Sequence, residues 1–175
     1  MLSSEGEETY DLGKIEVGIR QLVNSSEDMK QDQMSLRKSR FIRSFLQSKY
    51  TALEILRRDA ADAEINISYG LQMVGVIGSS ASGNEEKIFE QILEFIQKQE
   101  NLEGYGIHLV NTNQRVMVLF GESEENLYQA FDKILRIGRV HCDEFVVAVS
   151  WAHCSLLNGS LAYLEANTAY DSRFL

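Results

Sequence analysis

The stretch "GYGIHLVNTNQRVMVLFGE", residues 104–122, predicts two short strands joined by the polar turn Asn111-Thr112-Asn113-Gln114. Residues 105–110 and 115–120 are rich in the β-branched, aromatic and apolar side chains that suit a pleated, half-buried surface. Asparagine tolerates the left-handed backbone angles of a tight turn. We therefore expect a β-hairpin here, and the segments on either side of it decide the fold.

The segment before the hairpin predicts one strand and one helix. Residues 70–78, "GLQMVGVIG", form a continuous apolar run that is typical of a buried strand. A helix is expected from Ser82 or Asn84, either of which can cap it, through Leu102, and Gly104 ends it. The apolar face of this helix carries Ile88, Phe89, Ile92, Leu93, Phe95 and Ile96.

The segment after the hairpin repeats this pattern. Ser123 is placed to cap a helix whose inward face carries Leu127, Ala130, Phe131, Ile134, Leu135 and Ile137. Residues 144–151 then predict a fourth strand, and a last helix begins at about Asn158 or Gly159. The order β-α-β-β-α-β indicates the α+β class and a ferredoxin-like core, an antiparallel sheet with both helices on one face. Residues 65–175 would hold this core and the C-terminal helix.

Residues 1–62 predict an N-terminal helical extension that resembles a short coiled coil. Ile15, Leu22, Met29 and Leu36 recur every seven residues, and we propose them as a dimer seam. The companion series starts with Leu12 and Ile19 but then meets Ser26 and Gln33, so the repeat is imperfect. A parallel homodimer is favoured, although a helix packing on its own domain would produce the same stripe. A second apolar cluster is expected to turn back onto the folded domain: Phe41, Ile42, Phe45, Leu46, Leu53 and Leu56.

The amino-acid composition is typical of a soluble globular protein. With 44% apolar and 25% charged residues, the 175-residue chain resembles an ordinary soluble globular protein. It has no apolar run long enough to span a bilayer and no basic, apolar signal pattern at its N-terminus, and its two cysteines suit a reducing cytosol. We therefore expect a cytoplasmic location.

Charge argues against direct nucleic-acid binding by these residues, because the net charge is −9. It is unevenly distributed. Residues 37–58 hold seven basic residues against the single acid Glu54, a net +6. This window is either a solvated helix face or a contact for an acidic partner or an anionic lipid surface.

Three candidate sites fail on their residue types. The loop "GSSASGNE" has Gly78 and Gly83 at phosphate-loop spacing, but Asn84 and Glu85 stand where lysine and a hydroxyl are needed. The pairs His141-Cys142 and His153-Cys154 lie at opposite ends of the predicted fourth strand, too far apart to share one metal ion. His108 stands alone on a strand, and no serine near any histidine lies in a nucleophile turn.

The hairpin is the fourth candidate. Ferredoxin-like nucleotide cyclases of the diguanylate type carry a Gly-Gly-Asp/Glu-Glu-Phe turn at this place, with a further Asp at the end of the first strand. Here the turn is Asn111-Thr112-Asn113-Gln114, and the first strand ends in Val76-Ile77-Gly78-Ser79-Ser80 without an acid. We therefore predict no catalytic residue, cofactor site or metal site, and a protein that is not an enzyme.

Three stretches together resemble a known family. They are "DLGKIEVGIRQLVNSSEDMKQDQMSLRKSRFIRSFLQ", the α+β run with its degenerate cyclase-like (GGDEF-like) hairpin, and a last helix with the pattern A-Y-x-E-A-x-x-A beginning at Ala162. The chain looks like the cytoplasmic segment of membrane-anchored AraC-type transcriptional regulators, or the similar middle region of AraC-type response regulators.

The resemblance implies a non-catalytic signalling and dimerisation module. In that family a sensor and membrane spans come before this region and a helix-turn-helix pair follows it, so DNA would be bound only by a domain outside this chain. The N-terminal helix would carry a signal and the cyclase-like domain would pass it on. The alternative is a small-molecule-binding sensor domain, with its pocket on the sheet face or at the loop of residues 78–83.

Overall fold

The computed structural model describes residues 5–79, 84–109 and 114–172, with side chains from residue 15 onward. The chain divides into two compact units, Met1–Arg37 and Lys38–Leu175. The described residues form five α-helices, a 3₁₀ turn and four strands, which confirms the mixed α+β class. No helix in the described part of the chain combines the length and apolar character needed to cross a membrane.

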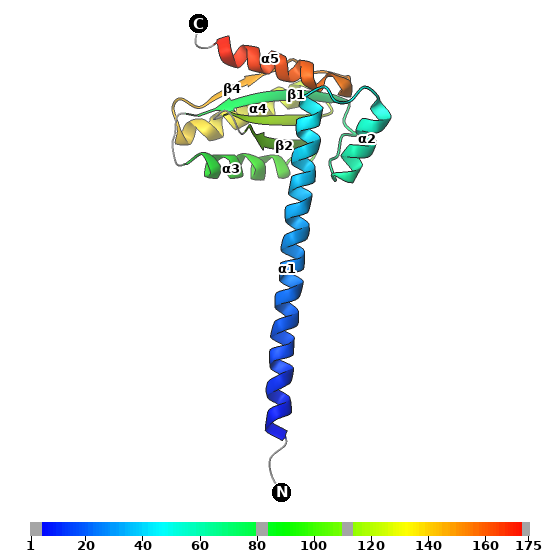
Figure 1. Ribbon diagram of the computed structural model, residues 1–175. Helices are drawn as coiled ribbons and strands as arrows, with labels where there is room; N and C mark the ends of the chain where they lie inside the picture. Colours follow the sequence, from blue (N-terminus) through cyan, green and yellow to red (C-terminus); the bar gives the residue numbers. More distant parts are fainter. Residues whose placement is uncertain (1–4, 80–83, 110–113, 173–175) are drawn as a thin grey trace. The chain divides into compact units, whose positions relative to one another are not determined.

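The four strands form one antiparallel sheet in the order β2-β3-β1-β4 (Figure 1). The strands are β1 (Leu71–Gly78), β2 (Leu102–His108), β3 (Arg115–Gly121) and β4 (Val146–Val149). The pairing of β2 with β3 confirms the predicted hairpin, and the N–H of Leu109 donates to the carbonyl of Gln114 over 3.2 Å. Asn111, Thr112 and Asn113, the predicted turn, lie outside the described residues.

Helices α3 (Glu85–Gln97) and α4 (Glu124–His141) supply the core on one face of the sheet. The predicted apolar faces are confirmed: Ile88, Phe89, Ile92 and Ile96 of α3 are buried together with Leu127, Ala130, Phe131 and Ile134 of α4. They pack with strand residues of the same face: Met73, Ile77, Met117 and Leu119. Ser123 caps α4 as expected, since its Oγ accepts the N–H of Asn126 over 3.2 Å.

A second set of helices covers the other face. The end of α1 (Glu5–Leu46), α2 (Leu53–Asp62) and α5 (Gly159–Ser172) bury their apolar residues in one cluster with the sheet. This cluster includes Phe41, Ile42, Phe45, Leu46, Leu56, Val74, Val76, Val118, Phe120, Ala162 and Ala166. The prediction that the second apolar cluster turns back onto the domain is therefore confirmed except at Leu53, which is half-buried and lies outside this cluster. The compact unit includes the end of α1 and α2, which the sequence analysis placed in the extension of residues 1–62.

Two predicted boundaries are wrong, for packing reasons. Helix α3 ends at Gln97 rather than Leu102, and Gly104, expected to end it, lies inside β2. A Cβ on Gly104 would stand 2.6 Å from Leu119 and 2.7 Å from Ile96, so packing requires a glycine there.

The fourth strand is also shorter than residues 144–151. Val149 pairs with Gly75, but the next bridge joins His153 to Gln72, which places one extra residue on the β4 side. The Oγ of Ser150 accepts the N–H of Val74 over 3.0 Å within this bulge.

The continuous helix pattern predicted over residues 11–62 is interrupted. Helix α1 ends at Leu46 and α2 begins at Leu53. Ser48 has a φ of 58°, and the N–H of Lys49 donates back to the carbonyl of Ser44 over 3.2 Å. A left-handed C-terminal cap therefore ends α1. No glycine or proline marks this end, which is why the sequence did not reveal it.

Replacing Ser48 with glycine should stabilise the compact unit, because a residue with a side chain pays about 1 kcal/mol or more in the left-handed region. The matched control is Ser44→Gly in the last turns of α1, which should destabilise by about 1 kcal/mol. Denaturant unfolding of both variants checks the pair. The same sign for both changes would contradict the helix end described here.

Phe45→Ala should cost about 3–5 kcal/mol of unfolding free energy, because Phe45 is 3% exposed and packs edge-on against Phe120 of β3. Val140→Ala is the control, since Val140 is 79% exposed and should change stability by no more than about 0.5 kcal/mol. Thermal and denaturant unfolding measure both. A small effect at Phe45 would show that the end of α1 is dispensable to the core.

Candidate functional site

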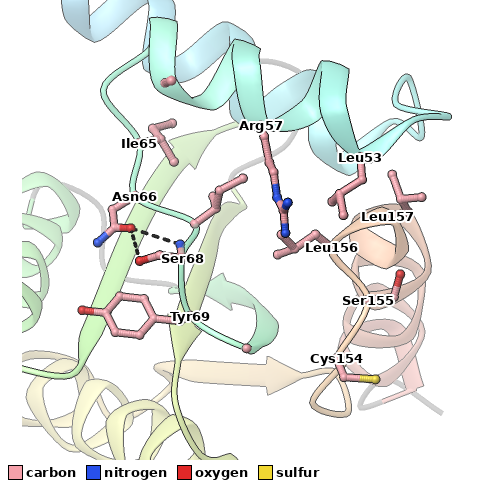
Figure 2. Close-up of a pocket in the computed structure, with 13 residues that line it drawn as sticks. Leu53, Arg57, Ile65, Asn66, Ser68, Tyr69, Cys154, Ser155, Leu156 and Leu157 are labelled. Atoms are coloured by element: carbon pink, nitrogen blue, oxygen red, sulfur yellow. Dashed lines mark hydrogen bonds between the residues drawn. The ribbon is translucent and has the colours of Figure 1, made fainter.

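An open groove of about 800 Å³ lies within the compact unit (Figure 2). Its first wall is one face of α2, where Leu53, Arg57 and Ala61 recur every four residues. The second wall is the segment of residues 65–70, which links α2 to β1. The third wall is residues 154–157, which follow β4 and lead through the 3₁₀ turn Leu156–Asn158 into α5. Three parts of the chain that are far apart in sequence therefore meet at this groove.

The charge of the groove comes from one side chain. Arg57 is the one ionised side chain among its described lining residues, and the guanidinium makes no hydrogen bond or ion pair with any described residue. Its neighbour Arg58 is engaged, because Nη2 lies 3.2 Å from Oδ1 of Asp59. Figure 2 shows the Arg57 side chain extending from α2 toward Leu156. The groove thus pairs apolar walls with a single available cation.

The second wall is fixed by a local turn and by the half-buried phenol of Tyr105. The backbone N–H and the hydroxyl of Ser68 both donate to Oδ1 of Asn66, over 3.0 and 2.6 Å (Figure 2). The N–H of Asn66 donates to the hydroxyl of Tyr105 on β2 over 3.0 Å. The pKa of Tyr105 is raised to about 12, mainly by burial and also by the nearby Glu103 carboxylate, while the hydrogen bond from Asn66 opposes both.

Polar contacts with β1 and α5 fix the position of the third wall. Nε2 of Gln72, which is fully buried, donates to the carbonyl of Ser155 over 2.6 Å, and Oε1 of the same amide has no hydrogen-bond partner among the described residues. His153 pairs through its backbone with Gln72, and its Nε2 lies 2.9 Å from Oε2 of Glu165 on α5. The same carboxylate oxygen accepts the N–H of Trp151 over 3.2 Å. The loop before α5 is therefore tied to both β1 and α5.

The lining residues carry few titratable groups. They include the thiol of Cys154 and the hydroxyls of Ser68, Tyr69 and Ser155, but no histidine and no carboxylate among the described ones. Besides Arg57, the titratable side chains of the described lining are Tyr69 and Cys154. In the described part of the chain, no three histidine, cysteine or acidic residues gather where they could hold a metal ion.

The predicted places for a ligand do not coincide with this groove. Apolar clusters cover both faces of the sheet, and the sheet-face pocket expected for a sensor domain stays a prediction. Of the glycine-containing loop, residues 80–83 lie outside the described residues. Gly78 has a packing role, because an added Cβ would overlap the hydroxyl of Tyr170.

The end of β1, where a cyclase keeps its metal acids, holds a cavity of only about 20 Å³, among residues that include Ser79, Glu85 and Arg115. The guanidinium carbon of Arg115 stands 4.6 Å from the ring centre of Phe89, a cation–π contact. Nε of Arg115 is buried and has no hydrogen-bond partner in the part of the chain that the structure describes. A cavity of this size holds about one water molecule, so the space between these described residues is too small for a nucleotide.

Each histidine that the sequence singled out has a separate environment. His141 lies at the end of α4 with Nε2 2.9 Å from Oε1 of Gln91 on α3, whereas His153 pairs with Glu165 on α5. His108 is exposed at the end of β2, and its carbonyl accepts Nη2 of Arg43 over 3.3 Å. The two His-Cys pairs therefore contact different helices.

The predicted dimer seam lies along α1. Ile15, Leu22, Met29 and Leu36 are 56%, 71%, 62% and 52% exposed, and Ile19 of the companion series is 55% exposed. These values belong to a single chain, so the stripe is open to a partner. Most of the basic window is exposed as well: Arg37, Arg40, Arg43, Lys49, Arg57 and Arg58.

Comparison of the chain with models of known protein families gave no match, and comparison with curated proteins gave none either.

The fold should lose stability between pH 10 and about 12 through Tyr105, because the folded chain holds this phenol proton more tightly than the unfolded chain does. The stabilisation is complete below pH 10 and is lost as the pH rises toward 12. Denaturant unfolding across this range should give a shallower fall for Tyr105→Phe than for the parent chain. An equally steep fall in the variant would mean that another group causes the pH dependence. Tyr50 is one such group, because burial and the Asp59 carboxylate raise its pKa to about 12.

Proposed function

We propose that the chain is a non-catalytic signalling module in which two copies pair along α1 and the compact unit Lys38–Leu175 responds to the state of that pair. The observation that carries this proposal is the exposed seam of Ile15, Leu22, Met29 and Leu36. A contiguous apolar stripe of this kind on a polar helix is usually covered by a partner. The helix is long, 42 residues, and isolated helices gain little stability from their own propensity.

A parallel pair fits the order of the side chains. In a parallel pair, each seam residue packs against the same residue of the second copy. Ser26 therefore faces Ser26, and Gln33 faces Gln33. The two antiparallel alignments that overlap the stripe most fully set Gln33 opposite Ile15 or Leu22, which would desolvate its amide against a leucine or isoleucine. A parallel pair also brings Asp32 near Arg37 of the second copy, two opposite charges at flanking positions.

The route for a signal is continuous along the backbone. Helix α1 runs without interruption from the seam to Leu46, and its last turns are buried with Val74, Val76 and Phe120 of the sheet. A change in the pairing of two α1 helices would therefore act on a packed core rather than on a flexible linker.

The strand order β2-β3-β1-β4, with α3 and α4 on one face, supports a ferredoxin-like core of the degenerate cyclase type. Together with the resemblance of the three quoted stretches, it extends the proposal to a bacterial AraC-type transcription regulator acting in the cytoplasm. DNA would be bound by a helix-turn-helix domain outside residues 1–175.

The second candidate function is a small-molecule sensor domain. The groove lined by Arg57, Leu53 and Leu157 favours it, because concave sites with apolar walls and few polar groups are typical of small-molecule sites.

Leu22→Asp should convert the dimer to a monomer in sedimentation equilibrium, because it removes a seam leucine worth at least about 2 kcal/mol when buried and places a charge there. Asn24→Asp is the matched control, since it adds the same charge two residues away, off the seam, and should leave the dimer in place. A parent chain that sediments as a monomer, or a Leu22→Asp variant that stays dimeric, would refute the seam.

A further inference from the structure

We propose that the groove between α2, residues 65–70 and residues 154–157 binds a small molecule with one anionic group and an apolar body, such as a medium-chain carboxylic acid. The proposal rests on the second candidate function, for which it names the class of ligand, and is independent of pairing along α1. Three observations lead to it: the size of the groove, its one available cation, and the position of that cation among apolar side chains.

The size and walls suit a small molecule. A volume of about 800 Å³ lies within the range of roughly 300–1,000 Å³ that is typical of small-molecule sites. Half-buried apolar side chains come from all three walls: Leu53, Ile67, Leu156 and Leu157. The body of a ligand would therefore find apolar surface on each side.

The charge of the groove selects an anion. Arg57 faces no carboxylate among the described lining residues, whereas Arg58 beside it is bonded to Asp59. A planar guanidinium can donate two parallel hydrogen bonds to a carboxylate, phosphate or sulfonate. Arg57 also belongs to the basic window of residues 37–58, whose net charge of +6 attracts anions although the chain as a whole carries −9.

The arrangement defines an orientation for the ligand. Leu53 lies one helical turn before Arg57, and Figure 2 shows Leu53 near Leu157 and the arginine directed toward Leu156. An anionic group held by Arg57 would therefore place its apolar body between Leu53 and the leucines that precede α5. Such a ligand would join α2, which follows α1, to the loop that leads into α5.

Decanoate titrated into the full chain by calorimetry is the direct test, with Arg57→Gln as the variant and Arg58→Gln as the matched control. Loss of a charge-assisted hydrogen bond should weaken binding about ten- to a hundredfold in Arg57→Gln. Arg58→Gln should bind like the parent chain, and decanol, which lacks the charge, should bind about as weakly as decanoate binds to Arg57→Gln. Circular dichroism confirms that both variants fold.

Cys154 gives a readout at the groove itself, because its exposed thiol is one of the lining groups. Decanoate should slow alkylation of Cys154 by iodoacetamide, followed by mass spectrometry, and should leave the rate at Cys142 in the same chain unchanged. Cys142 does not line the groove and serves as the internal reference.

The results of these experiments distinguish failure of the ligand site from failure of the α1 dimer. No binding of decanoate, equal binding by decanol, or equal weakening in Arg57→Gln and Arg58→Gln would overturn it, as would capture of a peptide in place of the acid. Binding with Cys154 protection that persists in the Leu22→Asp variant supports the site whatever the oligomeric state. If the parent chain is monomeric yet binds decanoate through Arg57, the seam fails and the groove stands.

Discussion

The burial of the last turns of α1 against the sheet is the contact on which the rest of the compact unit depends. Phe41, Ile42, Phe45 and Leu46 enter the same apolar cluster as the core-facing residues of β1 and β3 and the small residues of α5. The fit is close: a Cβ on Gly159, the first residue of α5, would stand 2.6 Å from the ring of Phe45. Because closely packed interiors shift as units rather than yield locally, the end of α1 and the start of α5 must move together or not at all.

Apolar residues cover both faces of the sheet, and buried polar side chains lie where β4 ends and the loop to α5 begins. Gln72 shows the consequence, since it lies in a strand whose other residues pack among apolar neighbours. Its amide is tolerated there because it donates to the carbonyl of Ser155. The bulge at Ser150 and the pair of His153 with Glu165 hold the same loop. These contacts fix the third wall of the groove and connect it to α5. The shape of the groove therefore depends on the hydrogen bonds at the end of β4.

The sequence predicted the elements well where side-chain period alone decides them. The apolar faces of α3 and α4, the cap at Ser123 and the strand over residues 71–78 follow from local patterns. It failed where tertiary contacts decide. Gly104 looked like a helix stop but is a strand residue that makes room for Ile96, and the break after Leu46 depends on a left-handed Ser48 that no local signal marks. The groove could not be foreseen, because Arg57, Ser68 and Leu157 are brought together only by the fold.

Two functions that looked like alternatives share one stretch of chain. Residues 15–36 leave an apolar stripe exposed, residues 41–46 enter the core, and α2 begins seven residues after α1 ends and forms a wall of the groove. A ligand that joined α2 to the loop before α5 would tighten the same cluster into which α1 inserts. By linkage, the factor by which pairing of α1 changes the affinity for the ligand is the factor by which the ligand changes the pairing equilibrium. Pairing and ligand binding would then be two inputs to one packed core, and a ligand that binds both states equally would leave the pairing unchanged.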